Sequence, residues 1–355
     1  MIRNAPKKVF LYAGLPKTGS AFLRQEVFTK LTESLVCVNP EGVTSALQEM
    51  HVAQYSPTCK NRVKKMVMEA LTEITQDTVL ITDLSLAGGA CDNLSQMPEI
   101  TDFLADLFPD ASVIITLRNQ VDWLLSLYKH ETTGRDIPIT KFLNYRDGAF
   151  GAAKKQNYPN VDALGFDFVK ICEYYVKIFG KENVHILFYE DMAENQEDFV
   201  CQVGEIFDCD ITGDVNFRME NRSFSAFSMQ LTLWKEKFRT LLIWNKNRRL
   251  GEGWLVRIIQ WLGSYDLGGE LWRDAIKKKG VRYAFAIALR RVLLRLRWDY
   301  FIRNVLDRII YLDWDLLGKE RRKILSQHYS RLNGGLVPYL KNSLAKQYYV
   351  SVSKE

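Results

Sequence analysis

The feature that most constrains this chain is a short apolar run, followed by a glycine-rich turn and then a helical pattern. The run is Val9–Ala13, and its β-branched and aromatic members predict a buried strand. Gly14 and Gly19 predict a tight turn, and apolar residues recur at helical spacing from Ser20 onward. Backbone N–H groups at such a turn and at a helix start lack partners, and the helix dipole adds positive potential. The segment therefore predicts a site for an anion, usually a phosphate.

The turn differs from the loop that binds nucleoside triphosphates, which reads G-x-x-x-x-G-K-[ST]. Gly14 and Gly19 have the required spacing, but Ser20 stands where the lysine should be, and Lys17 lies inside the loop. The run Pro-Lys-Thr-Gly-Ser-Ala-Phe at 16–22 closely resembles the phosphosulfate loop of sulfotransferases, P-K-[ST]-G-[ST]-[ST]-[WF]. That family uses 3′-phosphoadenosine-5′-phosphosulfate (PAPS) as its sulfuryl donor. The alternative is a glycine turn with a solvated lysine.

The resemblance implies a role for each residue of this loop. Lys17 is expected to be catalytic, and Phe22 matches an aromatic residue that stacks on the adenine in the family's cytosolic branch. A helix core residue is the alternative for Phe22. The residues expected to bind PAPS here are Lys17, Thr18, Gly19, Ser20, Ala21 and Phe22.

A second segment, Ala111–Tyr128, combines a predicted strand at Val113–Leu117 with a helix that begins near Gln120. Sulfotransferases carry R-[ND]-P-x5-S here, and its arginine and serine grip the donor's 3′-phosphate. Arg118 and Ser126 have that spacing, although Gln120 replaces the usual proline. A planar guanidinium can hold phosphate oxygens bidentately, and a hydroxyl adds a donor.

A third segment, Val184–Met192, resembles the strand of this family that ends in Y-E-D-[LM]. The tyrosine approaches the adenine in the cytosolic branch, so the resemblance implies an adenine contact for Tyr189. The alternative is a core residue at the end of the strand.

The reaction also requires a base that takes the acceptor's proton. Asp83 follows a predicted strand at Thr78–Thr82, in a region where many family members read S-D-E-S-L-S-G. Leu84 stands at the glutamate position of that pattern, so Asp83 is our predicted base. The alternatives are that Asp83 only satisfies nearby N–H groups at the loop start, or that His51 or His130 is the base.

Strands and helices alternate through Phe207, which predicts a three-layer α/β/α fold with a mostly parallel central sheet and a P-loop-like nucleotide site. Ligands bind beyond the carboxyl ends of such strands. The predicted residues at those ends are Lys17, Asp83, Arg118 and Tyr189. We expect three parts: a core at 1–225, a mainly helical and acceptor-side part at 226–340, and a loosely packed tail at 341–355. We expect 39–58 to be loop.

The helical part carries an apolar stripe from Val281 to Leu296, interleaved with arginines. One interpretation is a helical subdomain that packs on the sheet. The other is a set of interfacial helices that contacts anionic lipid or an anionic glycan.

The formal net charge of +6 suits anionic ligands, and no nucleic-acid-binding signature accompanies it. The six cysteines show no metal-site spacing, and no apolar run of about 18 residues occurs. We therefore expect a cytoplasmic, metal-independent sulfotransferase with no transmembrane segment, for which peripheral membrane contact stays open. The acceptor (a glycan, a lipid, or a small-molecule alcohol or amine) and the oligomeric state are also open. The alternatives are a P-loop kinase or phosphotransferase, and a catalytically altered membrane-surface binding protein.

Overall fold

The computed structural model describes most of the chain outside one long segment. The described residues are 8–31, 36–52, 56–82, 84–133, 135–153, 156, 158–211, 215, 225–234, 312–340 and 345–349. The predicted base Asp83 and the arginine-interleaved stripe at 281–296 lie outside them. The chain divides into two compact units. The first comprises residues 1–127, 140–222 and 317–355, and the second comprises residues 128–139 and 223–316.

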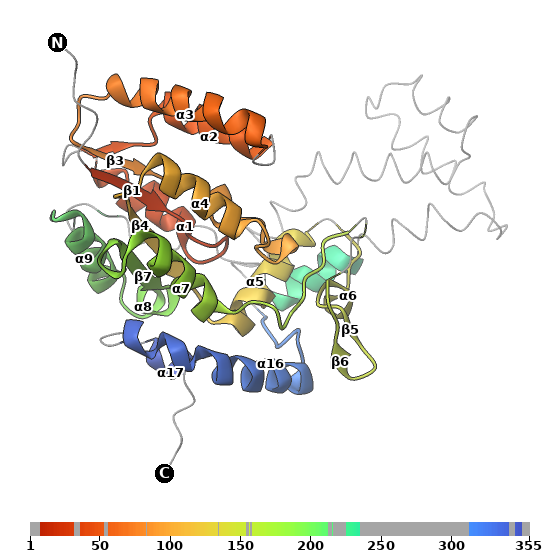
Figure 1. The fold of residues 1–355 in the computed structure, drawn as a ribbon. Helices are drawn as coiled ribbons and strands as arrows, with labels where there is room; N and C mark the ends of the chain where they lie inside the picture. Colours follow the sequence, from red (N-terminus) through yellow and green to blue (C-terminus); the bar gives the residue numbers. More distant parts are fainter. Residues whose placement is uncertain are drawn as a thin grey trace, which may run out of the picture. The chain divides into compact units, whose positions relative to one another are not determined.

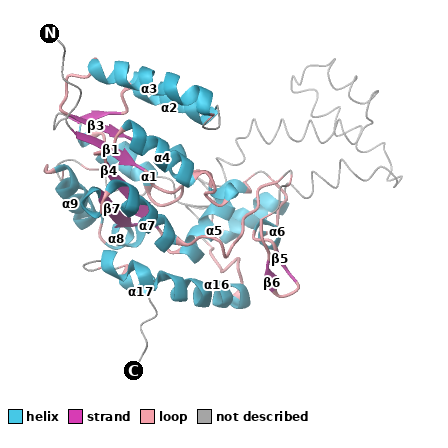
Figure 2. Ribbon diagram, viewed as in Figure 1, coloured by secondary structure: helices cyan, strands magenta, loops and turns pink. Residues whose placement is uncertain are grey.

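A parallel sheet forms the centre of the first unit (Figures 1 and 2). Within the described residues it has five strands in the order β2-β3-β1-β4-β7. The strands are β1 (Lys8–Tyr12), β2 (Val36–Val38), β3 (Thr78–Ile81), β4 (Ser112–Leu117) and β7 (Val184–Phe188). All neighbours pair in parallel, and β1 lies between β3 and β4. This confirms the predicted fold class and the strands predicted in Val9–Ala13, Thr78–Thr82, Val113–Leu117 and Val184–Met192.

Helices cover both faces of the sheet. On one face, side chains of β1 and β4 share a core cluster with those of η1, α8 and α9; this cluster includes Phe10, Tyr12, Leu23, Val27, Ile114, Met192 and Phe199. On the other face, α7 packs against β4, β7 and α4 (Figure 1). The helices with these contacts are α1 (Ser20–Phe22), the π-helical η1 (Leu23–Val27), α4 (Met97–Leu107), α7 (Phe168–Phe179), α8 (Tyr189–Glu194) and α9 (Gln196–Phe207).

Further helices and strands complete the described part of the chain. They are α2 (Glu41–Val52), α3 (Pro57–Thr72), η3 (Leu84–Ala87), η4 (Ala90–Asp92), α5 (Gln120–Glu131), α6 (Ile139–Phe142), β5 (Tyr145–Arg146), β6 (Ala149–Phe150), η5 (Lys181–Asn183), α16 (Lys319–Leu332), η7 (Asn333–Tyr339) and α17 (Lys346–Tyr349). None of the described helices is long and apolar enough to cross a membrane.

The prediction of loop at 39–58 is wrong, because α2 occupies most of it. Val43, Ala46, Leu47 and Met50 are its buried residues, and they recur at helical spacing. Gly42 made a helix look unfavourable at this place in the sequence, since glycine destabilises helices. A Cβ at Gly42 would lie 2.8 Å from the Cβ of Ala70 on α3, so the glycine lets the two helices approach closely.

The C-terminal segment belongs to the first unit. The expectation of loose packing at 341–355 is wrong for its described part, because Tyr349 on α17 is only 1% exposed. Its ring contacts Phe188 at the end of β7 with centroids 5.1 Å apart. Upstream, Gln120 and Asn333 exchange two side-chain hydrogen bonds of 2.7 and 3.0 Å, which tie η7 to α5.

The second unit is described at residues 128–133, 135–139, 225–234 and 312–316. The Asp313 carboxylate accepts a hydrogen bond of 2.8 Å from the Ala226 N–H and lies 3.4 Å from Lys129 Nζ. Lys129 is buried, so this ion pair compensates a charge removed from water.

Candidate functional site

The loop after β1 adopts a conformation that its sequence constrains closely. Lys17 has φ 67° and Gly19 has φ 87°, both in the left-handed region. A Cβ at Gly19 would lie 2.6 Å from Met192 Cε on α8. Gly19 therefore meets both a dihedral and a steric requirement of the turn.

Three consecutive carbonyls of the loop accept hydrogen bonds from side chains. Leu15 O accepts from Thr18 Oγ1 at 2.6 Å. Pro16 O accepts from Trp123 Nε1 at 2.7 Å, and Lys17 O accepts from Arg118 Nη1 at 3.2 Å.

The bonds to Pro16 O and Lys17 O fix the direction of two N–H groups of the loop. No described peptide bond is cis, and C=O and N–H point in opposite directions across a trans peptide. The N–H groups of Lys17 and Thr18 therefore point away from Trp123 and Arg118. Trp123 and Arg118 thus hold two loop carbonyls and orient two N–H donors toward the opposite side, as an anion site requires.

A buried tyrosine lies close to the loop. Tyr12 is fully buried, and its hydroxyl accepts a hydrogen bond of 3.0 Å from Thr116 Oγ1. Burial raises its pKa to about 12, so the hydroxyl stays neutral at physiological pH. A Cβ at Gly14 would lie 2.2 Å from the end of the Tyr12 ring, so Gly14 lets the chain pass closely over it.

Arg118 and Tyr189 come together from the ends of β4 and β7. The Arg118 guanidinium carbon lies 4.2 Å from the Tyr189 ring centroid, a cation–π contact. Tyr189 and Phe22 are only partly buried, and both pack against the same core cluster. The structure therefore gathers Lys17, Arg118 and Tyr189 in one place, because each follows a neighbouring parallel strand.

A buried carboxylate lies beside this pair. Glu190 is 7% exposed and accepts hydrogen bonds from the Asn119 N–H at 2.8 Å and the Tyr349 hydroxyl at 3.1 Å. Burial raises the pKa of Glu190, and these hydrogen bonds oppose the rise. The Glu190 carboxylate thus connects the backbone directly after Arg118 to Tyr349 on α17.

The remaining predicted residues occupy varied surroundings. Thr18, Ser20 and Ser126 are buried, the last on α5, and Ala21 is half-buried on α1. His51 is exposed near the end of α2, and the exposed His130 on α5 lies 3.2 Å from the carboxylate of Glu131. Within the described residues, no group of three or more His, Cys, Asp or Glu side chains is placed to hold a metal ion.

Sequence reasoning missed the parts of the site that support it. Trp123 and Tyr12 lie inside the quoted segments, but only their contacts give them a role. Glu190 lies within the Y-E-D match of the sequence. No local sequence pattern marks its partner Tyr349, which lies in the tail expected to be loosely packed.

The chain is similar to known proteins in two respects, a family model and solved structures. Residues 6–250 match the family model described as "Sulfotransferase domain". Among solved structures, the chain is similar to a sulfotransferase from Alicyclobacillus acidocaldarius, with 16% identity, 67% of this chain and 91% of that chain covered, and a TM-score of 0.45. It is also similar to the sulfotransferase domain from the curacin biosynthetic pathway, with 12% identity and a TM-score of 0.30. That match covers 61% of this chain and 81% of the other chain. No curated protein sequence matches the chain.

Proposed function

This chain belongs to the sulfotransferase family, and we propose that it transfers a sulfuryl group from PAPS to a hydroxyl or amine of an acceptor. The observation that carries the proposal is the loop after β1, where side chains donate hydrogen bonds to three carbonyls. Thr18, Trp123 and Arg118 donate to the carbonyls of Leu15, Pro16 and Lys17. The N–H groups of Lys17 and Thr18 point away from Trp123 and Arg118, toward the side on which we place the anion.

Charge governs the proposed roles. PAPS is a polyanion, and the loop N–H groups of residues 17–20 suit its 5′-phosphate. Arg118 and Ser126 would hold the 3′-phosphate, while Phe22 and Tyr189 would contact the adenine. The stacking of Arg118 on Tyr189 supports this, because it fixes a guanidinium beside an aromatic ring.

The proposed step is an in-line displacement at sulfur. The acceptor oxygen forms a bond to sulfur while the bond from sulfur to the phosphate oxygen breaks, and the phosphate leaves with that electron pair. Lys17 stabilises the charge that grows on the bridging oxygen, an interaction that is strongest in the transition state. Asp83 takes the acceptor's proton. No step of this proposal requires a metal ion. Three points stay predictions: metal independence, a cytoplasmic location, and an acceptor-side role for residues 226–340.

Calorimetry tests the donor assignment. We expect adenosine 3′,5′-bisphosphate to bind without a divalent ion, and ATP with Mg²⁺ to bind far more weakly. Transfer of label from ³⁵S-PAPS to a panel of alcohols, amines, lipids and glycans then tests the reaction. Preferential binding of Mg²⁺-ATP would reject the proposal and favour a phosphotransferase.

A further inference from the structure

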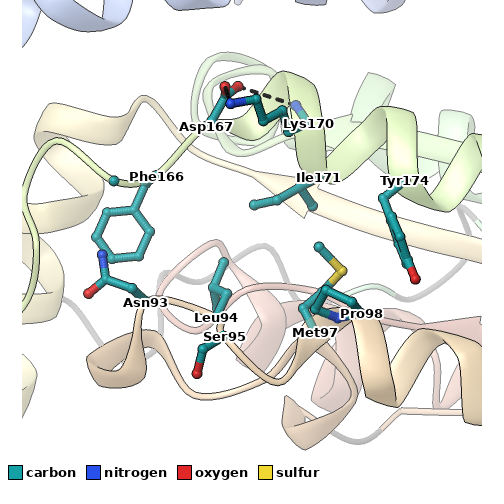
Figure 3. A pocket seen from close by; sticks show the side chains of 11 residues that line it. Asn93, Leu94, Ser95, Met97, Pro98, Phe166, Asp167, Lys170, Ile171 and Tyr174 are labelled. Atoms are coloured by element: carbon teal, nitrogen blue, oxygen red, sulfur yellow. Dashed lines mark hydrogen bonds and ion pairs between the residues drawn. The ribbon is translucent and has the colours of Figure 1, made fainter.

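A cavity of about 290 Å³ lies between the beginnings of α4 and α7 (Figure 3). Its apolar walls come from two segments far apart in sequence, Leu94–Pro98 and Phe166–Ile171. Figure 3 shows Leu94, Met97 and Ile171 directed into the hollow, with Phe166 and Tyr174 at its two sides. This volume lies just below the range of about 300–1,000 Å³ that small-molecule sites usually have, so an occupant would be small.

Most polar side chains that line this cavity are already bonded to protein groups. The Asn93 amide exchanges two hydrogen bonds of 3.0 Å with the Asp162 backbone. Tyr174 donates to Asp102 Oδ1 at 2.7 Å. Lys170 Nζ lies 3.4 Å from Asp167 Oδ2 (Figure 3). An occupant would therefore meet mainly apolar surface, which suits an apolar body and not a glycan with many hydroxyls.

The cavity is preformed and its wall is strained. Asn93 and Leu94 have φ 53° and 57°, and two successive non-glycine residues in the left-handed region cost free energy. The paired bonds to Asp162 hold this conformation. Strain of this kind is retained at functional sites more often than elsewhere.

The cavity also lies beside the loop proposed to bind the donor. In a parallel sheet, the helix that leads into a strand begins at the carboxyl edge, so the starts of α4 and α7 share an edge with that loop. One side chain joins the two places. The Trp123 ring contacts Phe166 with centroids 4.7 Å apart, and its Nε1 donates to Pro16 O.

From these observations we infer that the cavity binds the body of the acceptor, and that the acceptor is a compact apolar alcohol, aromatic or aliphatic. This inference rests on the proposed function, because it assigns the second substrate of the same reaction. It chooses among the acceptor classes that the sequence leaves open.

The test uses 2-naphthol as probe, with three variants of the full chain. Ile171→Trp fills the cavity, and Ile171→Ala enlarges it. Ile178→Trp is the matched control, since it adds the same ring seven residues later on α7, away from the cavity. Naphthol binding is followed by saturation-transfer NMR in the presence of adenosine 3′,5′-bisphosphate, and kcat/KM is measured with PAPS. Calorimetry gives the affinity for adenosine 3′,5′-bisphosphate.

We expect Ile171→Trp to lower naphthol binding and kcat/KM about tenfold or more, with the bisphosphate affinity unchanged and Ile178→Trp like wild type. Should Ile171→Trp fail to fold, Ile171→Ala decides, because it should raise kcat/KM for 4-phenylphenol relative to 2-naphthol. Equal naphthol binding and turnover in wild type and Ile171→Trp would overturn the cavity inference alone, as would turnover of glucose without turnover of any apolar alcohol. Failure of the bisphosphate to bind wild type would instead overturn the proposed function, and the acceptor role with it.

Discussion

Tyr349 donates a hydrogen bond of 3.1 Å to the buried carboxylate of Glu190, across 159 residues of chain. The same carboxylate accepts from the N–H of Asn119, the residue after Arg118. Glu190 itself follows Tyr189, on which Arg118 stacks. The C-terminal segment thus holds the backbone at both members of the Arg118–Tyr189 pair.

Tyr349→Phe should therefore weaken both the fold and the donor site. The variant keeps the ring but leaves a buried carboxylate short of one donor, which costs about 2 kcal/mol for a hydrogen bond to a charged group. Chemical denaturation should show this loss, and calorimetry should show weaker binding of adenosine 3′,5′-bisphosphate. Tyr348→Phe is the control, because Tyr348 accepts from Asn119 through its carbonyl and not its side chain. Equal effects in the two variants would contradict the role of the hydroxyl.

Glu190→Gln should change how stability depends on pH. Burial raises the folded-state pKa of Glu190 above its ordinary value of 4.5, so folding favours the protonated form. Its contribution to stability is therefore complete below about pH 4.5 and is lost as pH rises through the folded-state pKa. The uncharged glutamine lacks this loss, so the unfolding free energy of the variant should rise relative to wild type over that window. Urea denaturation between pH 4 and 8 measures the difference, and a difference that stays flat would show that Glu190 has an ordinary pKa.

The central sheet, and the edge of it at which ligands are expected to bind, could be predicted because both depend on local sequence patterns. Short apolar runs such as Val113–Leu117, rich in β-branched residues, predict buried strands, and parallel strands bring their carboxyl ends to one edge. Lys17, Arg118 and Tyr189 were therefore predicted near each other, and the structure places them so.

The supporting contacts could not be predicted, because they join residues far apart in sequence. Trp123 reaches Pro16 across 107 residues, and no local pattern pairs them. The helix α2 was missed for a different reason: Gly42 lowers helix propensity, but packing against Ala70 requires it. Burial of Tyr349 depends on the same kind of tertiary packing.

Lys17→Ala should lower turnover about a hundredfold or more, the usual result of removing one transition-state charge contact. The affinity for adenosine 3′,5′-bisphosphate should change much less, since that product lacks the sulfuryl group. Lys17→Arg should retain part of the rate because it keeps the charge. Lys177→Ala, an exposed lysine on α7, serves as control. Near-wild-type turnover of Lys17→Ala would remove Lys17 from the mechanism.

Arg118→Lys should weaken donor binding roughly tenfold while kcat changes little, because lysine keeps a charge but lacks the planar fork and the stacking surface. The hydrogen bond to Lys17 O and the contact with Tyr189 both depend on that plane. The KM for PAPS and the calorimetric affinity for the bisphosphate measure the effect. Arg146→Lys, at the exposed position of β5, should match wild type. An unchanged KM for PAPS would place Arg118 outside the donor site.

Trp123→Phe separates the two contacts of this side chain. Phenylalanine can still pack against Phe166 and Phe168, but it cannot donate to Pro16 O. Without that bond the peptide between Pro16 and Lys17 can rotate, and its N–H is no longer held toward the proposed anion. We expect stability to fall by about 1 kcal/mol, as for one hydrogen bond, and the affinity for adenosine 3′,5′-bisphosphate to fall with it. The exposed Trp314→Phe is the control. If Trp123→Phe loses stability but binds the bisphosphate as wild type does, the indole supports only the packing, and the loop holds its N–H groups in place by other means.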